Sequence, residues 1–423
     1  MAPVDVEVII VGAGAAGPAA AASLRARGLD CLILEARDRI GGRAFIETAT
    51  LDGPFDLGAS FIHAAEQGNP WSDIALAKAA PVIVDPGRRL LLAQGATAPR
   101  PADVALDAAT RRACKDLATA IQSGSRGSIG AFLSRTTSAD HFAAARIGPW
   151  LSGEDTDRLD PADFLATRDG EDWLLPDGYG TLVASFGTPL PVRLGCPVEA
   201  IRTTRERVEL ATAQGIVRSR YAILTVPLGV LQAGRIRLDP SPTSDVEAAW
   251  AGLPMGALTK VGIGFDSDVF GLGRDSYLFA EPTSERSILY LVRPGGRNHV
   301  MAFIGGSLAR EVAALPGSAL REAVAAPLVA HLGTAISDHI GACLTSEWHR
   351  DPWAMGSYAV AQPGMAGART ALRVPLSERL VYAGEAAASD GWHGTVAGAY
   401  LSGRAAARNV AHTASCGRAV KFE

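Results

Sequence analysis

Residues 6–43 read VEVIIVGAGAAGPAAAASLRARGLDCLILEARDRIGGR and decide the fold of the first part of the chain. Val8–Val11 is an uncharged run of β-branched residues, which is typical of a strand buried on both faces of a parallel sheet. Three glycines follow this run at the G-x-G-x-x-G spacing: Gly12, Gly14 and Gly17. An alanine-rich helix over 15–27 and a second strand over 31–34 come next. This order predicts a βαβ unit that binds a dinucleotide.

Each part of this unit has a physical role in binding. Gly12 permits the tight turn, Gly14 lets a pyrophosphate approach the backbone, and Gly17 lets the helix lie close to the sheet. The amides at the start of the helix then face the phosphates. Glu35 follows the second strand, where its carboxylate can accept hydrogen bonds from ribose hydroxyls. We expect these four residues to bind the cofactor.

Composition narrows the class of protein. The 423 residues, 48% hydrophobic and 20% charged, are ample for two packed domains and are not typical of disorder. No apolar run approaches the roughly 20 residues of a membrane span, and the opening MAPVDVE lacks the basic start of a signal peptide, so we expect a cytoplasmic protein without a membrane partner. Five scattered cysteines without a CxxC pair predict neither a disulfide framework nor a metal site. The net charge of -4 argues against nucleic-acid binding.

Periodicity beyond the first unit predicts further elements. We expect a turn at 98–101, and strands return after the largely helical stretch that follows it. The expected helices are 105–121 and 319–332, and the expected strands include 257–266, 287–293 and 299–305.

The two ends of the chain select the cofactor. The segment EARDRIGGR (35–43) resembles the R-x-G-G-R extension of FAD enzymes, in which arginines meet the pyrophosphate. The sequence has no second GxGxxG unit, which disfavours a nicotinamide reductant bound in its own domain. Near the other end, LVYAGEAAASDGWHGTVAGAYLSGRAA (380–406) resembles the tail with which flavin amine oxidases close over FAD.

Further motifs occur in the order of that family. They are DLGASFIH (56–63) with GNP (68–70), PDGYGTL (176–182), CPVEAI (196–201), ILTVPLGVL (223–231), MGALTKVGIGF (255–265) and WHRDPWAMGSY (348–358). The chain thus resembles the flavin-containing amine oxidases over nearly its full length, and within them the polyamine oxidase branch. The resemblance implies an α/β fold with two domains. One is a Rossmann-type FAD-binding domain assembled from discontinuous segments (1–79, 177–226 and 350–416), and the other is an α+β substrate-binding domain (80–176 and 227–349).

The resemblance also implies which residues meet FAD. In addition to Gly12, Gly14, Gly17 and Glu35, these are Arg37, Gly42, Arg43, Gly58, Ala59, Ser60, Val198, Trp348, Gly384, Glu385, Thr395 and Val396. Ser357 stands where monoamine oxidases carry the cysteine that is linked to the flavin, so we expect non-covalent FAD.

Lys260 is the residue that we expect to act in catalysis. It is one of only four lysines and interrupts an apolar strand, where it shares a face with Gly262 and Gly264; their missing side chains leave room for a flat ligand. Pattern alone also allows an edge-strand lysine that reaches water. The resemblance favours the first interpretation, because in that family this lysine holds a water against flavin N5.

Four residues are expected to contact the substrate. The resemblance places His63 near the path of the amine, Tyr358 at one wall of the amine site and Thr395 where monoamine oxidases have the second aromatic wall. Trp392 precedes the flavin-facing threonine and can form a wall of the pocket. The sequence is equally compatible with an ordinary packing role for Trp392. A purely structural role for His63 also stays open.

Charge is uneven along the chain. Residues 151–175 contain eight acids against two arginines, which would attract cationic amines if the segment lay in the substrate domain near the pocket. A solvated surface segment is the alternative.

The expected reaction is FAD-dependent oxidation of an amine, a polyamine or a related one, to an imine that water hydrolyses, with oxygen reduced to hydrogen peroxide. Three alternatives stay open at this point. They are an enzyme resembling carotenoid desaturases or porphyrinogen oxidases, an L-amino-acid oxidase, and a non-enzymatic prenyl-carrier escort module. The amino-acid oxidase would need an arginine for the substrate carboxylate, and GASFIH (58–63) offers none.

Overall fold

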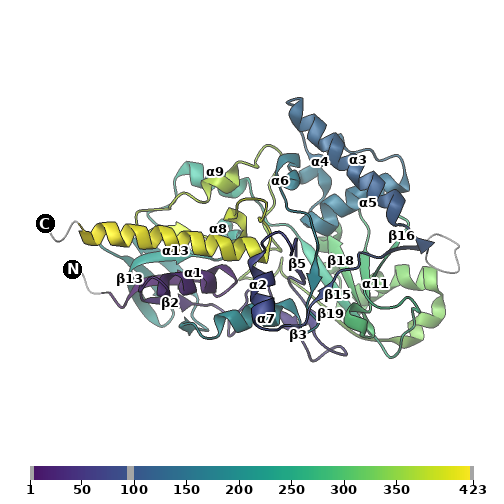
Figure 1. Cartoon of the computed structure of the whole chain (residues 1–423), viewed down its shortest axis with the longest axis horizontal. Helices are drawn as coiled ribbons and strands as arrows, with labels where there is room; N and C mark the ends of the chain where they lie inside the picture. Colours follow the sequence, from purple (N-terminus) through teal and green to yellow (C-terminus); the bar gives the residue numbers. More distant parts are fainter. Residues whose placement is uncertain (1–3, 93–99, 420–423) are drawn as a thin grey trace.

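The computed structural model describes residues 4–92 and 100–419, which form two large sheets with helices around them (Figure 1). The eight-stranded first sheet contains the opening βαβ unit. In spatial order its strands are β10 (Val192–Arg193), β2 (Cys31–Leu34), β1 (Val6–Val11), β13 (Gly215–Leu224), β12 (Val208–Thr212), β11 (Val198–Thr203) and β14 (Arg237–Asp239), while β20 (Leu380–Tyr382) pairs with β13. The predicted α/β class is confirmed.

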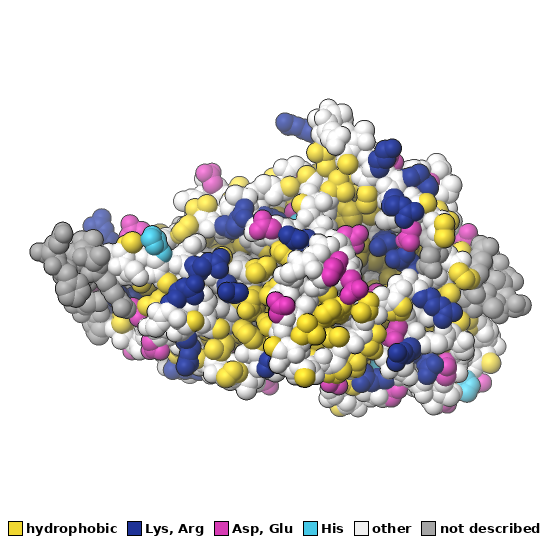
Figure 2. All heavy atoms as spheres, viewed as in Figure 1, with side chains coloured by type: hydrophobic (Ala, Val, Ile, Leu, Met, Phe, Trp, Pro, Cys, Tyr) yellow, Lys and Arg dark blue, Asp and Glu magenta, His cyan; other side chains and the backbone are white. Residues whose placement is uncertain are grey.

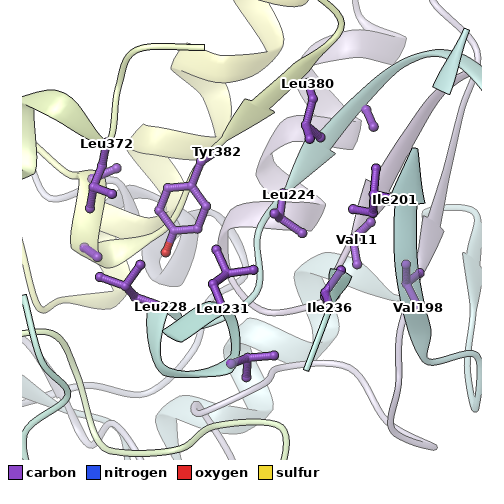
Figure 3. Packing of buried hydrophobic residues seen from close by; sticks show 14 of the residues in the cluster. Val11, Val198, Ile201, Leu224, Leu228, Leu231, Ile236, Leu372, Leu380 and Tyr382 are labelled. Carbon is purple, nitrogen blue, oxygen red and sulfur yellow. The ribbon is translucent and has the colours of Figure 1, made fainter. Parts of the chain in front are cut away.

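The centre of this sheet is parallel and fully buried. Val8 of β1 pairs with Cys31 of β2 on one side and with Tyr221 of β13 on the other, and Val8–Ile10 have no exposed surface. The uncharged β-branched run occurs here because both faces of the strand are covered. Side chains of β1, β13 and β20 meet those of α8 (Leu228–Gln232) in the core shown in Figure 3.

Helix α1 (Ala16–Arg25) and the long helix α13 (Val396–Ala419) lie side by side on the first sheet (Figure 1). A Cβ on Gly17 would lie 1.9 Å from the carbonyl oxygen of Gly12, so only glycine allows α1 to begin this close to the strand. The two helices join the first and last segments of the chain.

The seven-stranded second sheet carries Lys260. Its order is β19 (Ile340–Thr345), β15 (Leu258–Phe265), β18 (His299–Gly305), β17 (Leu289–Val292), β16 (Ser276–Ala280), β7 (Arg89–Leu92) and β8 (Arg100–Pro101). Helices α10 (Gly306–Ala313) and α11 (Gly317–Leu332) cover one side. A helical layer lies above the strands of the second sheet in the view of Figure 1. It contains α3 (Asp103–Gln122), α5 (Ser138–Ala145), the π-helix Arg146–Ser152 and α6 (Pro161–Leu165).

Two small sheets connect these layers. One is the pair β3 (Ile46–Glu47) and β4 (Phe55–Asp56). The other has the order β5 (Phe61–Ile62), β9 (Trp173–Leu174) and β6 (Ile83–Val84). The remaining helices are α2 (Pro70–Ala77), α4 (Ile129–Phe132), α7 (Tyr179–Gly187), α9 (Ser244–Ala251) and α12 (Ala368–Ala371).

The predicted domain boundary at residue 226 falls between β13 and β14, which are both strands of the first sheet. A boundary at residue 226 would cut the first sheet, because β14 pairs with β11 through Ile201 and Leu238. The segment after 226 therefore packs on the first sheet up to α9, whose Trp250 lies in the same core. Of the predicted turn at 98–101, residues 98–99 lie outside the described residues, and Arg100–Pro101 form β8.

Within the described ranges no helix is both long and apolar enough to cross a membrane, and no cluster of three metal-ligating side chains occurs. On the face in Figure 2, acidic and basic side chains are interspersed over the surface.

Candidate active site

A cavity of about 780 Å³ runs between the two large sheets and brings the predicted site residues together. Of the residues expected to bind FAD or substrate, Gly17 alone does not line it. Gly17 instead packs against the backbone of Gly12 in the glycine turn. We call this space the large cavity.

One end of the large cavity is formed by the glycine turn and the start of α1. Glu35 is buried there, and its two carboxylate oxygens accept hydrogen bonds from the amide of Ala13 at 2.6 Å and the amide of Arg37 at 2.9 Å. Burial raises the pKa of Glu35, while the two amides and the nearby arginines oppose that rise. These bonds fix the carboxylate at the edge of the cavity, in the position expected of a ribose ligand.

Two ion pairs join the first and last segments beside this end. Arg43 Nη1 donates to Glu385 Oε1 at 3.0 Å, and Arg37 Nη2 donates to Asp351 Oδ1 at 2.8 Å. The amide of Ala359 also donates to Glu385 at 3.1 Å. The sequence predicted both arginines and Glu385 as site residues, but Asp351, although it lies in the motif WHRDPWAMGSY (348–358), was not singled out.

The start of α13 faces the same cavity. Thr395 Oγ1 accepts from the amide of Gly398 at 2.9 Å and donates to the carbonyl oxygen of Trp392 at 2.6 Å, so Thr395 caps this helix. Two helix starts, those of α1 and α13, thus direct partial positive charge into one space.

These groups fit FAD. The α1 end offers amides and arginines for a pyrophosphate, and the α13 end offers amides for the oxygens of a ring system. Ser357, which also lines the cavity, has a buried hydroxyl without a hydrogen-bond partner among the described residues. Buried polar atoms are rarely left unpaired, so this hydroxyl indicates a polar ligand.

Lys260 lies on β15, lines the large cavity and contacts the segment 56–60. It is 4% exposed, and its ammonium donates to the carbonyl oxygen of Gly58, to Ser60 Oγ and, at 3.4 Å, to the carbonyl oxygen of Asp56. Burial lowers the pKa of Lys260 to about 8, although the charge of Asp56 opposes this. Burial raises the pKa of Asp56 to about 6, against the effect of Lys260 and two backbone amides.

The expectation that Gly262 and Gly264 make room for a flat ligand is wrong. A Cβ on Gly262 would lie 2.8 Å from side-chain atoms of both Leu51 and Phe55, and one on Gly264 would lie 3.2 Å from Leu51. The space beside these glycines is filled by core side chains, because the strand face that they share is covered by the segment around β4.

A second group of charges forms where the small sheet β5–β9–β6 meets the large cavity. The pairing of Ile62 and Val84 with Trp173 places His63 and Asp85 on either side of Asp172. His63 Nδ1 contacts Asp172 Oδ2 at 3.1 Å, and the amide of Asp85 donates to the carbonyl oxygen of Asp172 at 2.8 Å. Tyr277 donates its hydroxyl to Asp85 Oδ2 at 2.7 Å. All four line the large cavity.

The electrostatics of this group favour a cation. Burial raises the pKa of Asp85, and the nearby charge of Asp172 adds to the rise. Burial lowers the pKa of His63, but attraction and hydrogen bonding to Asp172 outweigh this, so the pKa lies above its usual value. We call Asp85, Asp169 and Asp172 the acidic mouth, since Asp169 lines the cavity beside them.

The acids of the stretch 151–175 differ in location: some line the large cavity, and others form ion pairs away from it. Five of its acids line the large cavity: Asp160, Asp163, Asp169, Glu171 and Asp172. Glu154 is instead 1% exposed and accepts two hydrogen bonds from Arg310, and Asp157 pairs with Arg135 on the surface. Among the acids of the stretch, only those from Asp160 onwards thus line the large cavity.

Aromatic side chains form other walls of the large cavity. Tyr358 donates its hydroxyl to the carbonyl oxygen of Leu151 at 2.7 Å, and the Arg168 guanidinium lies 4.8 Å from the ring centroid of Trp392. Phe61 and Phe303 face each other at 6.2 Å between ring centroids. The predicted substrate residues His63, Tyr358, Trp392 and Thr395 all line this space.

Sequence reasoning missed two arginines of the cavity. Arg89 on β7 and Arg146 at the start of the π-helix both donate to Asp107 Oδ1, at 2.5 Å and 3.3 Å. These residues come from three separate elements, and no local motif marks them.

Comparison with known proteins agrees with this geometry. The sequence model of the family described as flavin containing amine oxidoreductase matches residues 87–411. The chain is a member of this family. The model of an NAD(P)-binding Rossmann-like domain matches residues 10–76, which include the βαβ unit. As a flavin-containing amine oxidoreductase, the protein is an FAD-dependent enzyme that oxidises amines.

Relatives of this amine oxidoreductase cover most of the chain. Polyamine oxidase 4 of Oryza sativa subsp. japonica is 28% identical over 443 residues, which cover 95% of this chain and 87% of the relative. Lysine-specific histone demethylase 1 homolog 2 of Arabidopsis thaliana is 27% identical, and the match covers 96% of this chain but 59% of that protein.

Solved structures share the fold of this amine oxidoreductase. A double mutant of putrescine oxidase superposes with a TM-score of 0.79 at 18% identity and covers 96% of this chain and 98% of its own. Cyclohexylamine oxidase from Brevibacterium oxydans IH-35A has a TM-score of 0.78 at 23% identity, with 97% and 100% coverage.

Proposed function

We propose that the protein oxidises di- or polyamines, with oxygen reduced to hydrogen peroxide. The acidic mouth is the observation that carries this proposal. Two carboxylates, Asp85 and Asp172, lie side by side in the cavity that also holds Lys260. A distal ammonium of the substrate would relieve their repulsion, while the amine to be oxidised would lie deeper, among the aromatic walls.

Residues of the large cavity have separate roles in this proposed reaction. Bound FAD would supply the redox chemistry, which is removal of a hydride equivalent from the carbon next to the amine nitrogen and reduction of oxygen. Glu35, Arg43 and Glu385 would hold its ribose and pyrophosphate-ribityl parts, and the start of α13 would meet its ring. Phe61, Phe303 and Trp392 exclude water and favour the uncharged form of the reacting amine. Water then hydrolyses the imine to a carbonyl product.

Lys260 is the group that we assign to catalysis. Its ammonium is held by Gly58 and Ser60 at the edge of the large cavity, where it can orient a water or give a proton to reduced oxygen. Because the lowered pKa brings this group close to neutral pH, its proton is exchanged more easily than that of a surface lysine.

We also infer a non-covalent cofactor, because Ser357 carries no thiol for a thioether link. The cytoplasmic location, the absence of a nucleic-acid partner and the limits of the two domains stay predictions of the sequence.

Substrate preference tests this proposal. The wild type should have a higher kcat/KM for a diamine than for a monoamine of the same chain length, and salt should reduce the difference, because exposed charges are screened over about 8 Å at physiological ionic strength. Asp172→Asn and Asp85→Asn should each lower kcat/KM for the diamine about tenfold while the monoamine changes little. Asp157→Asn, which removes a surface carboxylate of the same stretch, is the control. A monoamine preference that salt does not alter would refute the diamine assignment.

A second candidate, an amino acid as substrate, is favoured by Arg146. Its guanidinium shares one carboxylate oxygen of Asp107 with Arg89 and lines the large cavity, where it could bind a carboxylate. An assay of peroxide release with amino acids separates the two candidates. Turnover of amino acids that Arg146→Met abolishes would select this one.

A further inference from the structure

Lys260 contacts a second, smaller cavity through Ser60. Ser60 lines both this space, of about 30 Å³, and the large cavity, and its hydroxyl accepts a hydrogen bond from the Lys260 ammonium. The hydroxyl in turn donates to the thioether sulfur of Met301 at 3.8 Å, which is a weak acceptor. The small cavity is large enough for a water molecule.

His299, at the start of β18, lines the small cavity together with Ser60. Its side chain is 1% exposed, and its Nδ1 lies 2.7 Å from Asp52 Oδ1. The carboxylate fixes the proton on Nδ1, which leaves Nε2 as an acceptor. Nε2 is buried and has no hydrogen-bond partner among the described residues.

This pair can hold a proton for a time. Burial lowers the pKa of His299, against the effect of Asp52, so the ring readily gives back a proton that it receives. Asp52 is 42% exposed, and its other oxygen accepts from the amide of Asn298 at 2.6 Å. The carboxylate would stabilise an imidazolium in the way that a carboxylate stabilises a catalytic histidine.

The proposed reaction requires such a proton. A substrate that arrives as R₂CH–NH₂R′⁺ loses one proton before it reacts. When its hydride equivalent leaves, R₂C=NHR′⁺ remains, and oxygen becomes H₂O₂ by taking up two electrons, that hydrogen and one proton. One proton therefore leaves the substrate early, and one is needed later at oxygen.

We propose that a water in the small cavity joins Ser60 to His299, and that the His299–Asp52 pair stores the proton that Lys260 exchanges with the active site. A proton shifts from the Lys260 ammonium to Ser60 Oγ, from Ser60 to the water and from the water to His299 Nε2. Lys260 can then accept the substrate's proton, and the reverse shift supplies the proton that oxygen needs. His299 and Asp52 act through Lys260 and do not touch the substrate or the cofactor. This inference rests on the proposed oxidase reaction.

Few charged groups among the described residues surround the His299–Asp52 pair. Asp52 and Arg297 face His299, Asp56 lines the small cavity with it, and Lys260 lies on the far side of Ser60. Asp56 accepts from the amides of Tyr179 and Gly180, both at 3.1 Å, which hold its carboxylate in place.

His299→Asn tests whether the His299–Asp52 pair stores a proton, because asparagine keeps a donor towards Asp52 but has no group at the position of Nε2. The FAD-loaded enzyme is reduced with dithionite and mixed with oxygen in H₂O, D₂O and their mixtures. We expect reoxidation to slow at least threefold, and the curved dependence of the wild-type rate on deuterium fraction to become linear. Ser60→Ala should act in the same direction. His339→Asn is the matched control, because His339 Nδ1 lies 2.7 Å from Asp266 Oδ1 in an exposed pair.

A crystal structure of the wild type supplies a readout that does not depend on activity. A water within hydrogen-bond distance of both Ser60 Oγ and His299 Nε2 is expected. A small cavity without that water, or unchanged rates and deuterium dependence in a His299→Asn enzyme with normal FAD content and melting temperature, would overturn the proposal. Since dithionite replaces the amine, failure of every amine to reduce the enzyme would instead count against the proposed function.

Discussion

Arg43 donates to the carboxylate of Glu385 at 3.0 Å, across 342 positions of sequence. The pair is mostly buried, with side-chain exposures of 22% and 7%. It joins the glycine-rich opening to the start of the tail, so the cofactor site exists only when both ends of the chain have folded together.

Replacement of Glu385 by Gln should therefore weaken FAD retention. Gln keeps the shape of the side chain but removes the charge that pairs with Arg43, and a hydrogen bond to a charged group contributes about 1.5–3 kcal/mol. Equilibrium dialysis of FAD should show a dissociation constant raised at least tenfold. Glu378→Gln, a change near the same tail but outside the large cavity, is the control. Unchanged affinity would show that Glu385 has no role in cofactor binding.

FAD should leave the protein intact when the chain is denatured. Ser357 offers a hydroxyl where a thioether link needs a thiol, so acid precipitation should release yellow colour into the supernatant. Absorbance of supernatant and pellet measures this directly. Flavin that stays with the precipitated chain would contradict the non-covalent assignment.

Lys260→Met should slow reoxidation by oxygen at least tenfold, which equals about 1.4 kcal/mol of barrier. Methionine keeps the length and the apolar packing but removes the ammonium beside Gly58 and Ser60. Stopped-flow mixing of reduced enzyme with oxygen gives the rate, and exposed Lys78→Met is the control. Wild-type reoxidation would remove Lys260 from the reaction.

The parts of the fold that sequence predicted are those with a strong local signal. Val8–Val11 is buried on both faces and so forms a continuous β-branched run, and the glycines after it are required by close backbone approach. The predicted strands 257–266 and 299–305 correspond to β15 and β18, where apolar residues recur along the strand.

For the acidic mouth the sequence marked only the acidic stretch that contains Asp169 and Asp172, and it did not indicate Asp85 or how the three come together. The acidic mouth depends on β5, β6 and β9, each only two residues long, too short to show a periodic pattern. His63 was found through family resemblance, whereas Asp85 and Tyr277 come from segments without motifs. The pairing of His299 with Asp52 likewise joins the start of β18 to a loop, and no sequence spacing connects the two.

The stability of the enzyme should depend on pH through His63. Because Asp172 raises the folded-state pKa of His63, this ion pair stabilises the fold fully below the unfolded pKa of about 6.5 and ceases to do so as pH rises through the folded value. The melting temperature of the wild type should therefore exceed that of His63→Gln at pH 5.5–6.5, and the difference should vanish by about pH 9. Asp172→Asn should remove the same pH dependence. A difference that grows towards high pH would have the wrong sign for this pair.

Glu154 and Asp157 lie three positions apart in the acidic stretch, yet neutralising them should change the free energy of unfolding by different amounts. Glu154 is 1% exposed and binds Arg310 with both oxygens, whereas Asp157 is 64% exposed. Glu154→Gln should lower the free energy of unfolding by about 1.5–3 kcal/mol, since it removes charge-assisted hydrogen bonds to a buried carboxylate. Asp157→Asn should change it by less than about 0.5 kcal/mol.

Urea unfolding of the FAD-loaded enzyme measures both changes, and kcat/KM for a diamine and a monoamine is compared at a temperature where both variants are folded. Neither variant should alter the ratio of the two substrates, because neither carboxylate lines the large cavity. A selective loss of diamine turnover in Glu154→Gln, with unchanged stability, would mean that the substrate reaches Glu154 and that the acidic mouth extends to the start of the stretch.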